Sequence, residues 1–185
     1  DMPQQPINDL RNTLKKSLAA LEGDSKIVVF GCDNGARVAT LAGKDVASIS
    51  LICTGMLPPS FVEYALRDGA SGVLVTGCSS SGCDFRLGSR WTEARLLGER
   101  EPRLRASVPR ERLRIVWADQ EEEKKLLDEK RKLEQQKRRE DQVKREAERR
   151  EAQRVENLRR NAESRSLVET DATFKTAVVL DDASI

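Results

Sequence analysis

Apolar residues follow two different patterns along this 185-residue chain. Between residues 7 and 21 they recur at helical spacing, at Ile7, Leu10, Leu14, Leu18 and Leu21, which predicts an amphipathic helix. Further on, four short runs rich in β-branched residues predict buried strands. These runs are KIVVFGC, VASISLIC, SGVLVTGC and RLRIVWAD.

The segments between these runs are predicted to be helical. We expect a helix from about 33 to 41, a second that Pro58 or Pro59 starts and Gly69 ends, and a third from about 88 to 104. Strands that alternate with short helices are typical of βαβ units. The sequence therefore predicts an α/β fold with an open, parallel, four-stranded (flavodoxin-like) sheet, in the order 2-1-3-4, with helices on both faces.

The composition changes after residue 119. Residues 120–165 contain no glycine or proline and consist mainly of helix-forming Glu, Lys, Arg, Gln and Ala. Acidic residues often precede basic ones by four positions, as in Asp128/Lys132 and Glu156/Arg160, which stabilises a helix. Steps of seven from Leu126 soon meet charged residues, so we expect a single charged helix and not a coiled coil.

Four segments follow from these patterns. We expect an N-terminal amphipathic helix and linker at 1–22, an α/β domain at 23–119, the charged helix at 120–165 and a tail at 166–185. The tail turns apolar around 174–180, which suggests an anchor on a partner subunit, with a frayed end as the alternative.

Charge and hydropathy exclude several functions. The net charge is only +2, and the basic residues of the extension alternate with acidic ones, so we expect no nucleic-acid binding. No apolar run reaches the roughly 18 residues of a membrane-spanning helix, and no signal peptide opens the chain. We expect a cytoplasmic protein, in which clustered cysteines bind metal or do redox chemistry more often than they form disulfides.

The chain has four cysteines and no histidine. Cys32, Cys53 and Cys78 each follow one of the first three predicted strands, and Cys83 lies in the loop after Cys78. In a sheet ordered 2-1-3-4 these strand ends are neighbours, ~4.8 Å apart, at the switch point where open α/β proteins bind ligands. We therefore expect the four thiols to converge at one edge of the sheet.

Four thiolates without imidazole fit a zinc site or an iron-sulfur cluster. Zinc sites usually use two short knuckles, whereas this chain has one C-x4-C pair and two separate cysteines, so the spacing favours iron and sulfur. Two alternatives stay open. The cysteines could be unligated core or redox thiols, or the domain could bind flavin or nucleotide through GCDNGAR at a helix N-terminus.

Three stretches resemble the delta subunit of methyl-viologen-reducing hydrogenase: FGCDNGAR, ISLICTGMLPPSFVEYALRDGASGVLVTGC and GCSSSGCDFRLGSRWTEAR. The resemblance covers roughly residues 26–119. It implies a non-catalytic [2Fe-2S] subunit that relays electrons between a partner's clusters and the flavin of a heterodisulfide-reductase-like subunit, in a hetero-oligomeric complex. It also implies the iron ligands, which are Cys32, Cys53, Cys78 and Cys83.

Two departures from the family's pattern matter. The family usually has C-x-x-C after the first strand, where this chain has CDNG with Gly35 in the second position. It usually has Cys-His-Tyr where this chain has Cys83, Asp84 and Phe85. A cluster would therefore need every cysteine of the chain, and the resemblance leaves the electron donor open.

The remaining polar residues give weaker indications. Arg86, Arg90 and Arg95, together with Trp91, follow the cysteine loop at near-helical spacing, which fits either a docking face or an ordinary solvated helix. Aspartates at 33, 84 and 119 also follow strand ends, but we assign them no chemistry, because Asp is a common helix cap. The main alternative function is a cofactor-free scaffold or interaction subunit of a larger complex.

Overall fold

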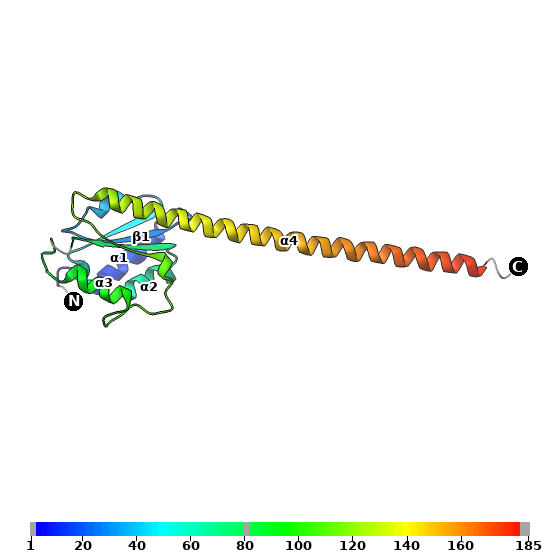
Figure 1. Ribbon diagram of the computed structural model, residues 1–185, viewed down its shortest axis with the longest axis horizontal. Coiled ribbons are helices and arrows are strands. Elements are labelled where there is room, and N and C mark those ends of the chain that lie inside the picture. The colour runs from blue at the N-terminus through cyan, green and yellow to red at the C-terminus, as the bar shows by residue number, and fades with distance from the viewer. Residues whose placement is uncertain (1–2, 80–81, 182–185) are drawn as a thin grey trace. The chain divides into compact units, whose positions relative to one another are not determined.

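The computed structural model describes residues 3–79 and 82–181, with side chains described as far as residue 162 (Figure 1). Its contacts divide the chain into two units, Asp1–Arg138 and Arg139–Ile185.

The first unit contains a parallel sheet of four strands. These are β1 (Ile27–Cys32), β2 (Val46–Leu51), β3 (Gly72–Gly77) and β4 (Leu113–Trp117). They lie in the order β2-β1-β3-β4, as the alternation of apolar runs and helical segments predicts. The fold class is therefore confirmed.

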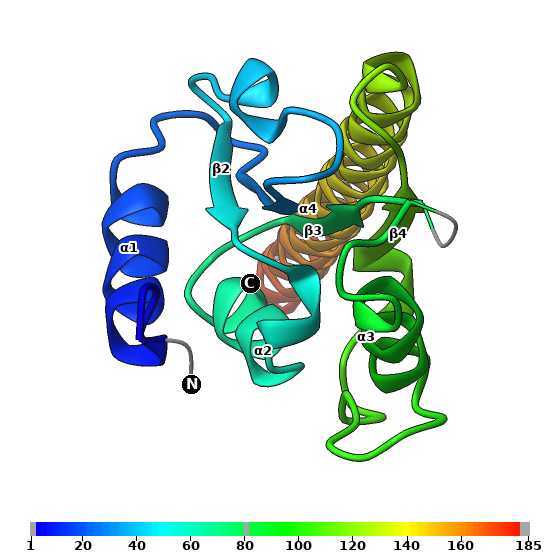
Figure 2. The same ribbon diagram turned by 90° about the vertical axis from the view of Figure 1, so that its left-hand side faces the viewer.

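Three helices cover one face of the sheet (Figure 2). They are α1 (Ile7–Ala19), α2 (Ser60–Arg67) and α3 (Gly88–Leu97). The expected apolar stripe of α1 packs into the same core as the strands, and Leu14 is fully buried there. Phe30 of β1 meets Phe61 of α2 edge to face, with ring centroids 6.4 Å apart.

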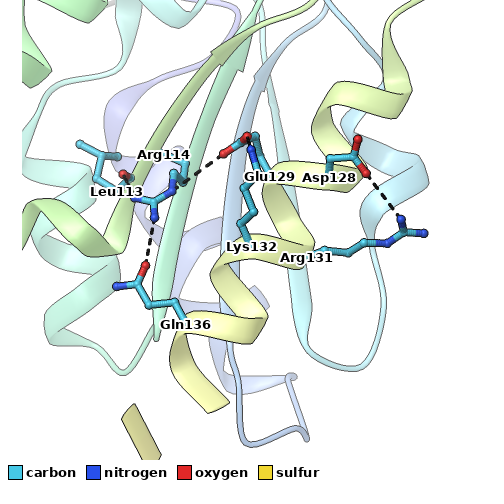
Figure 3. A network of polar contacts seen from close by, with 7 residues as sticks. All are labelled: Leu113, Arg114, Asp128, Glu129, Arg131, Lys132 and Gln136. Atoms are coloured by element: carbon cyan, nitrogen blue, oxygen red, sulfur yellow. Dashed lines mark hydrogen bonds and ion pairs between the residues drawn. The ribbon is translucent and has the colours of Figure 1, made fainter. Parts of the chain in front are cut away.

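The opposite face is covered by the 3₁₀ helix η1 (Val38–Leu41) and the first turns of α4 (Glu123–Asp181). Leu126 and Leu133 of α4 are 1% and 4% exposed and pack against strand residues of this face. Arg114 of β4 adds polar contacts to α4: its guanidinium donates to Gln136 at 3.0 Å and pairs with Glu129 at 3.8 Å (Figure 3). Glu129 also pairs with Lys132, and Asp128 with Arg131.

Two expected helices differ from the structure. The helix expected at 33–41 is wrong except for η1, because the Ala36 N–H donates to the Ala118 carbonyl at 2.9 Å and ties this segment across the sheet edge. The helix expected at 88–104 ends at Leu97, because Gly98 takes a left-handed φ of 91° that terminates it.

The second unit is the continuation of α4, which is helical through Asp181. Glu156 and Arg160 form an ion pair of the expected spacing, at 3.2 Å. Side chains from 163 onward, and therefore those of the expected anchor at 166–185, lie outside the described residues. Within the described part of the chain, no helix combines the length and apolar character needed to cross a membrane.

Candidate metal centre

All four cysteines of the chain meet at one edge of the sheet. Cys32, Cys78 and Cys83 form one buried cluster, with 3%, 2% and 9% of their surfaces exposed. Cys53 is 5% exposed, and its thiol hydrogen-bonds to that of Cys32. A Cβ placed on Gly88 would lie 2.6 Å from the sulfur of Cys53 and 3.5 Å from that of Cys83. The four cysteine side chains therefore lie together at one sheet edge, as the sequence predicts.

The fold explains how residues far apart in the sequence reach this edge. Cys32 is the last residue of β1, and it lies opposite Leu51 of β2, two residues before Cys53. Cys78 directly follows β3, the other neighbour of β1. Cys83 lies in the loop that leads from β3 into α3. The parallel sheet thus brings three strand ends together, and one loop supplies the fourth thiol.

Backbone amides point at several of the sulfurs, including those of Cys83 and Cys53. Burial acts to raise the pKa of Cys83, but the backbone N–H groups of Ser89 and Gly88, at the N-terminus of α3, outweigh it and lower the pKa. Cys53 begins the 3₁₀ helix η2 (Thr54–Met56), and its sulfur accepts a hydrogen bond from the Gly55 N–H at 3.3 Å. Such donors stabilise a thiolate, which is the form that binds metals.

The thiols also influence one another. The hydrogen bond with Cys53 lowers the pKa of Cys32, and the same bond, followed by burial, raises the pKa of Cys53. Burial, followed by the nearby charge of Cys32, raises the pKa of Cys78 to about 12. Ionising all four sulfurs together is therefore opposed by their mutual repulsion. A bound cationic centre would remove that repulsion, because metal binding favours deprotonated ligands.

The donor set fits a thiophilic metal or cluster. Among the described residues, no group of three or more His, Cys, Asp or Glu side chains already surrounds a metal-ion position. The thiols instead contact one another, Cys32 with Cys53 and Cys78 with both Cys83 and Cys32. The Ser89 hydroxyl beside them is buried and has no partner in the part of the chain that the structure describes. Ligation by the four cysteines stays a prediction.

Gly35 explains why a C-x-x-C motif is absent after β1. A Cβ at this position would lie 2.7 Å from the Gly77 carbonyl carbon and 2.8 Å from the Cys78 nitrogen. Backbone cannot yield as a flexible side chain can, so a cysteine does not fit there. The chain has only four cysteines, so no further cysteine could replace one of them as a ligand.

Three aspartates hold the cysteine loops, although sequence analysis assigned them no chemistry. Asp84 accepts a hydrogen bond from the Asn34 side chain at 2.6 Å, and Asp119 accepts one from the Ser79 N–H at 2.8 Å. Asp33 accepts one from a serine of β2. The sequence signal was their position, since Asp33 and Asp84 directly follow cysteines.

The arginines after the loop have different roles. Arg86 and Arg90 are exposed, as is Trp91. Arg95 is half-buried and donates to the Gly55 carbonyl at 3.1 Å, so it supports the turn that holds Cys53 and does not belong to an exposed face.

Comparison with known proteins shows that the chain matches one protein family. Residues 27–139 match the family described as "Methyl-viologen-reducing hydrogenase, delta subunit". The chain is 25% identical over 114 residues to the vhc iron-sulfur subunit of the F420-non-reducing hydrogenase of Methanococcus voltae, covering 55% of this chain and 76% of that protein. It is 28% identical over 83 residues to an iron-sulfur subunit of the F420-non-reducing hydrogenase of Archaeoglobus profundus, covering 45% of this chain and 61% of that protein. All four cysteines lie within the family match.

Proposed function

This chain belongs to the family of the methyl-viologen-reducing hydrogenase delta subunit, and we propose that it is a [2Fe-2S] electron-transfer subunit of a multisubunit oxidoreductase. The observation that carries the proposal is the gathering of four thiols at one sheet edge, in a chain that has no other cysteine and no histidine. The names of the relatives, both iron-sulfur subunits, support it. The chain itself is proposed to catalyse no reaction.

Cys32, Cys53, Cys78 and Cys83 would hold the cluster, with two thiolates for each iron. When bound, the cluster supplies one-electron redox chemistry. The N–H groups of Gly88 and Ser89, and that of Gly55, hydrogen-bond to ligand sulfurs and so favour the more negative, reduced state. Burial of the cysteines keeps water away from the site.

The proposal includes partners. An electron relay needs a donor and an acceptor, and we expect subunits that carry flavin and iron-sulfur clusters, of the hydrogenase and heterodisulfide-reductase type. We also propose that the second unit, the α4 continuation from Arg139, contacts a partner. The cytoplasm, which keeps thiols reduced, is the compartment that this proposal expects.

Metal and sulfide analysis tests the proposal. Full-length protein purified without oxygen should be brown, with about two iron and two acid-labile sulfide per chain, and dithionite should produce the paramagnetic signal of a reduced [2Fe-2S] centre. A colourless preparation that contains zinc would overturn it. A preparation without metal would favour the cofactor-free scaffold, and bound yellow flavin would favour the nucleotide-binding alternative.

Single substitutions then test the ligands. Cys53→Ser and Cys83→Ser should each lose most of the iron, while far-ultraviolet circular dichroism stays that of the wild type. Ser89→Ala is the matched control, because it alters a neighbouring hydroxyl and no proposed ligand. Full iron content in a cysteine variant would remove that residue from the ligand set.

A further inference from the structure

Large apolar side chains are exposed directly beside the cysteine site. Phe85, Leu87 and Trp91 are 49%, 38% and 39% exposed, and all three follow Cys83 within eight positions. Cys83 is itself the most exposed of the four cysteines, at 9%. Adjoining exposed apolar groups mark surfaces that other proteins cover. The protein therefore exposes apolar side chains close in sequence to its most accessible cysteine.

Backbone hydrogen bonds hold this segment in a fixed position relative to the Cys83 thiol. Arg86 has a φ of 57°, a left-handed conformation that is uncommon outside glycine. Its N–H donates to the Cys83 carbonyl at 2.8 Å, and the Leu87 N–H donates to the Phe85 carbonyl at 2.6 Å. The Phe85 N–H also bonds to the Cys83 sulfur. A strained turn held by such bonds is typical of a functional segment, and it places Phe85 and Leu87 in a set position relative to Cys83.

Arginine side chains border the apolar groups. Arg86 and Arg90 are exposed and have no ion-pair partner in the range of residues that the structure describes. The Arg100 guanidinium lies over the Trp91 ring, 4.4 Å from its centroid. Exposed cationic groups therefore accompany the exposed apolar residues of this segment.

The nearest carboxylates of this segment bond to other residues and, in the described part of the chain, form no ion pair with Arg86 or Arg90. Asp84 accepts the hydrogen bond from Asn34, and Glu93 accepts one from the Trp117 indole at 3.1 Å. No other acidic residue lies between positions 84 and 93. The guanidinium groups of Arg86 and Arg90 are therefore free to pair with carboxylates of a partner.

We propose that this surface docks the electron-transfer partner, and that the partner is a redox protein with an apolar contact area bordered by carboxylates. The Cys83 patch comprises Phe85, Arg86, Leu87, Arg90, Trp91 and Arg100. The inference rests on the proposed function. It goes further by naming the face of this protein that the partner contacts and the chemistry of the partner's own contact surface. One electron passes at the Cys83 patch: the partner's cofactor loses it and the site gains it, or the reverse, and no atom is transferred.

Charge reversal gives the first test, on the full-length, cluster-loaded chain. The probes are an acidic plant-type ferredoxin and a basic cytochrome c, with rates followed by stopped flow. Arg86→Glu combined with Arg90→Glu should slow exchange with ferredoxin about tenfold at low salt and speed exchange with cytochrome c, and salt should shrink both effects. Lys15→Glu with Lys16→Glu, the same charge change on exposed positions of α1, is the matched control.

A binding measurement tests docking without electron transfer. Fluorescently labelled ferredoxin should bind the double arginine variant about tenfold more weakly than the wild type or the α1 control. Trp91→Ser should weaken binding even at high salt, where apolar contact dominates. Leu127→Ser is its control, because Leu127 of α4 is also 39% exposed but lies outside the patch. Leu87→Ser repeats the test if the tryptophan variant proves unstable.

Several results would overturn the inference. Equal changes in patch and control variants would show that no specific face is used. A dimer that Trp91→Ser dissociates in sedimentation experiments would assign the patch to a second copy of this chain. A protein without iron would overturn the proposed function as well, whereas a loaded protein with unchanged rates and affinities would overturn this inference alone.

Discussion

The side-chain amide of Asn34 donates a 2.6 Å hydrogen bond to the carboxylate of Asp84. This bond joins the turn after Cys32 to the turn after Cys83, two segments that lie 50 positions apart in the chain. It therefore connects two of the proposed ligand loops independently of any metal. We expect it to help hold the loops in place once a cluster is bound.

Removal of the amide tests this role. Asn34→Ala leaves the Asp84 carboxylate without its donor, and an exposed hydrogen bond of this kind contributes about 1 kcal/mol, or about a fivefold effect. The variant should therefore lose iron to a chelator several-fold faster than the wild type, measured by bleaching of the visible spectrum. Thr40→Ala, which removes an exposed hydrogen bond on η1, should leave the rate unchanged. Equal rates in all three proteins would contradict the role.

Gly88 gives a second prediction. Because a Cβ at Gly88 would lie 2.6 Å from the Cys53 sulfur, Gly88→Ala should displace that thiol and reduce iron content by more than half. Gly43→Ala is the control, since a Cβ there meets nothing within 4 Å. Iron per chain is measured after anaerobic purification. If the Gly88 variant binds as much iron as the wild type, then iron binding does not require the Cys53 sulfur at the position that it has in this structure.

The strands and their order could be predicted from sequence because the apolar runs are short, β-branched and separated by helical segments. That order alone placed the ends of β1, β2 and β3 side by side, so the gathering of Cys32, Cys53 and Cys78 followed from topology. The segment after β1 could not be predicted. Its conformation depends on the Ala36 N–H bonding to Ala118, a contact that no local pattern encodes.

The packing of the start of α4 could not be predicted from the sequence either. Leu126 and Leu133 stand in a mostly charged sequence with few other apolar residues, so periodicity could not distinguish a solvated helix from one that packs on the sheet. The structure buries both, and Arg114 of β4 is the polar partner that fixes the contact. Hydrogen bonds between loops, such as that of Ser79 to Asp119, depend in the same way on tertiary placement.

The packing of α4 yields a third prediction. Leu133→Ala should lower the free energy of unfolding by about 2–5 kcal/mol, because Leu133 is 4% exposed in the core. Leu158→Ala is the matched control on the same helix, since Leu158 is 62% exposed, and its effect should stay within about 0.5 kcal/mol. Urea unfolding followed by tryptophan fluorescence measures both. Similar stabilities of the two variants would contradict the packing of α4 on the sheet.

Asp119 gives a prediction about pH. The Ser79 backbone N–H, followed by the Ser79 side chain, lowers the pKa of Asp119 below its ordinary value in the folded protein. The unfolded chain therefore binds a proton at this group more readily than the folded chain does. The carboxylate stabilises the fold at neutral pH, and this contribution is lost as the pH falls through the ordinary value of about 3.9 towards the lowered one.

Asp119→Asn removes this titration while keeping an oxygen that can accept the Ser79 N–H. The urea midpoint of cluster-free wild type should therefore fall more steeply than that of the variant between about pH 5 and pH 3. At neutral pH the variant should be the less stable of the two, because a neutral amide accepts a weaker hydrogen bond than a carboxylate. Parallel pH profiles would mean that Asp119 does not hold the loop after Cys78 through its charge.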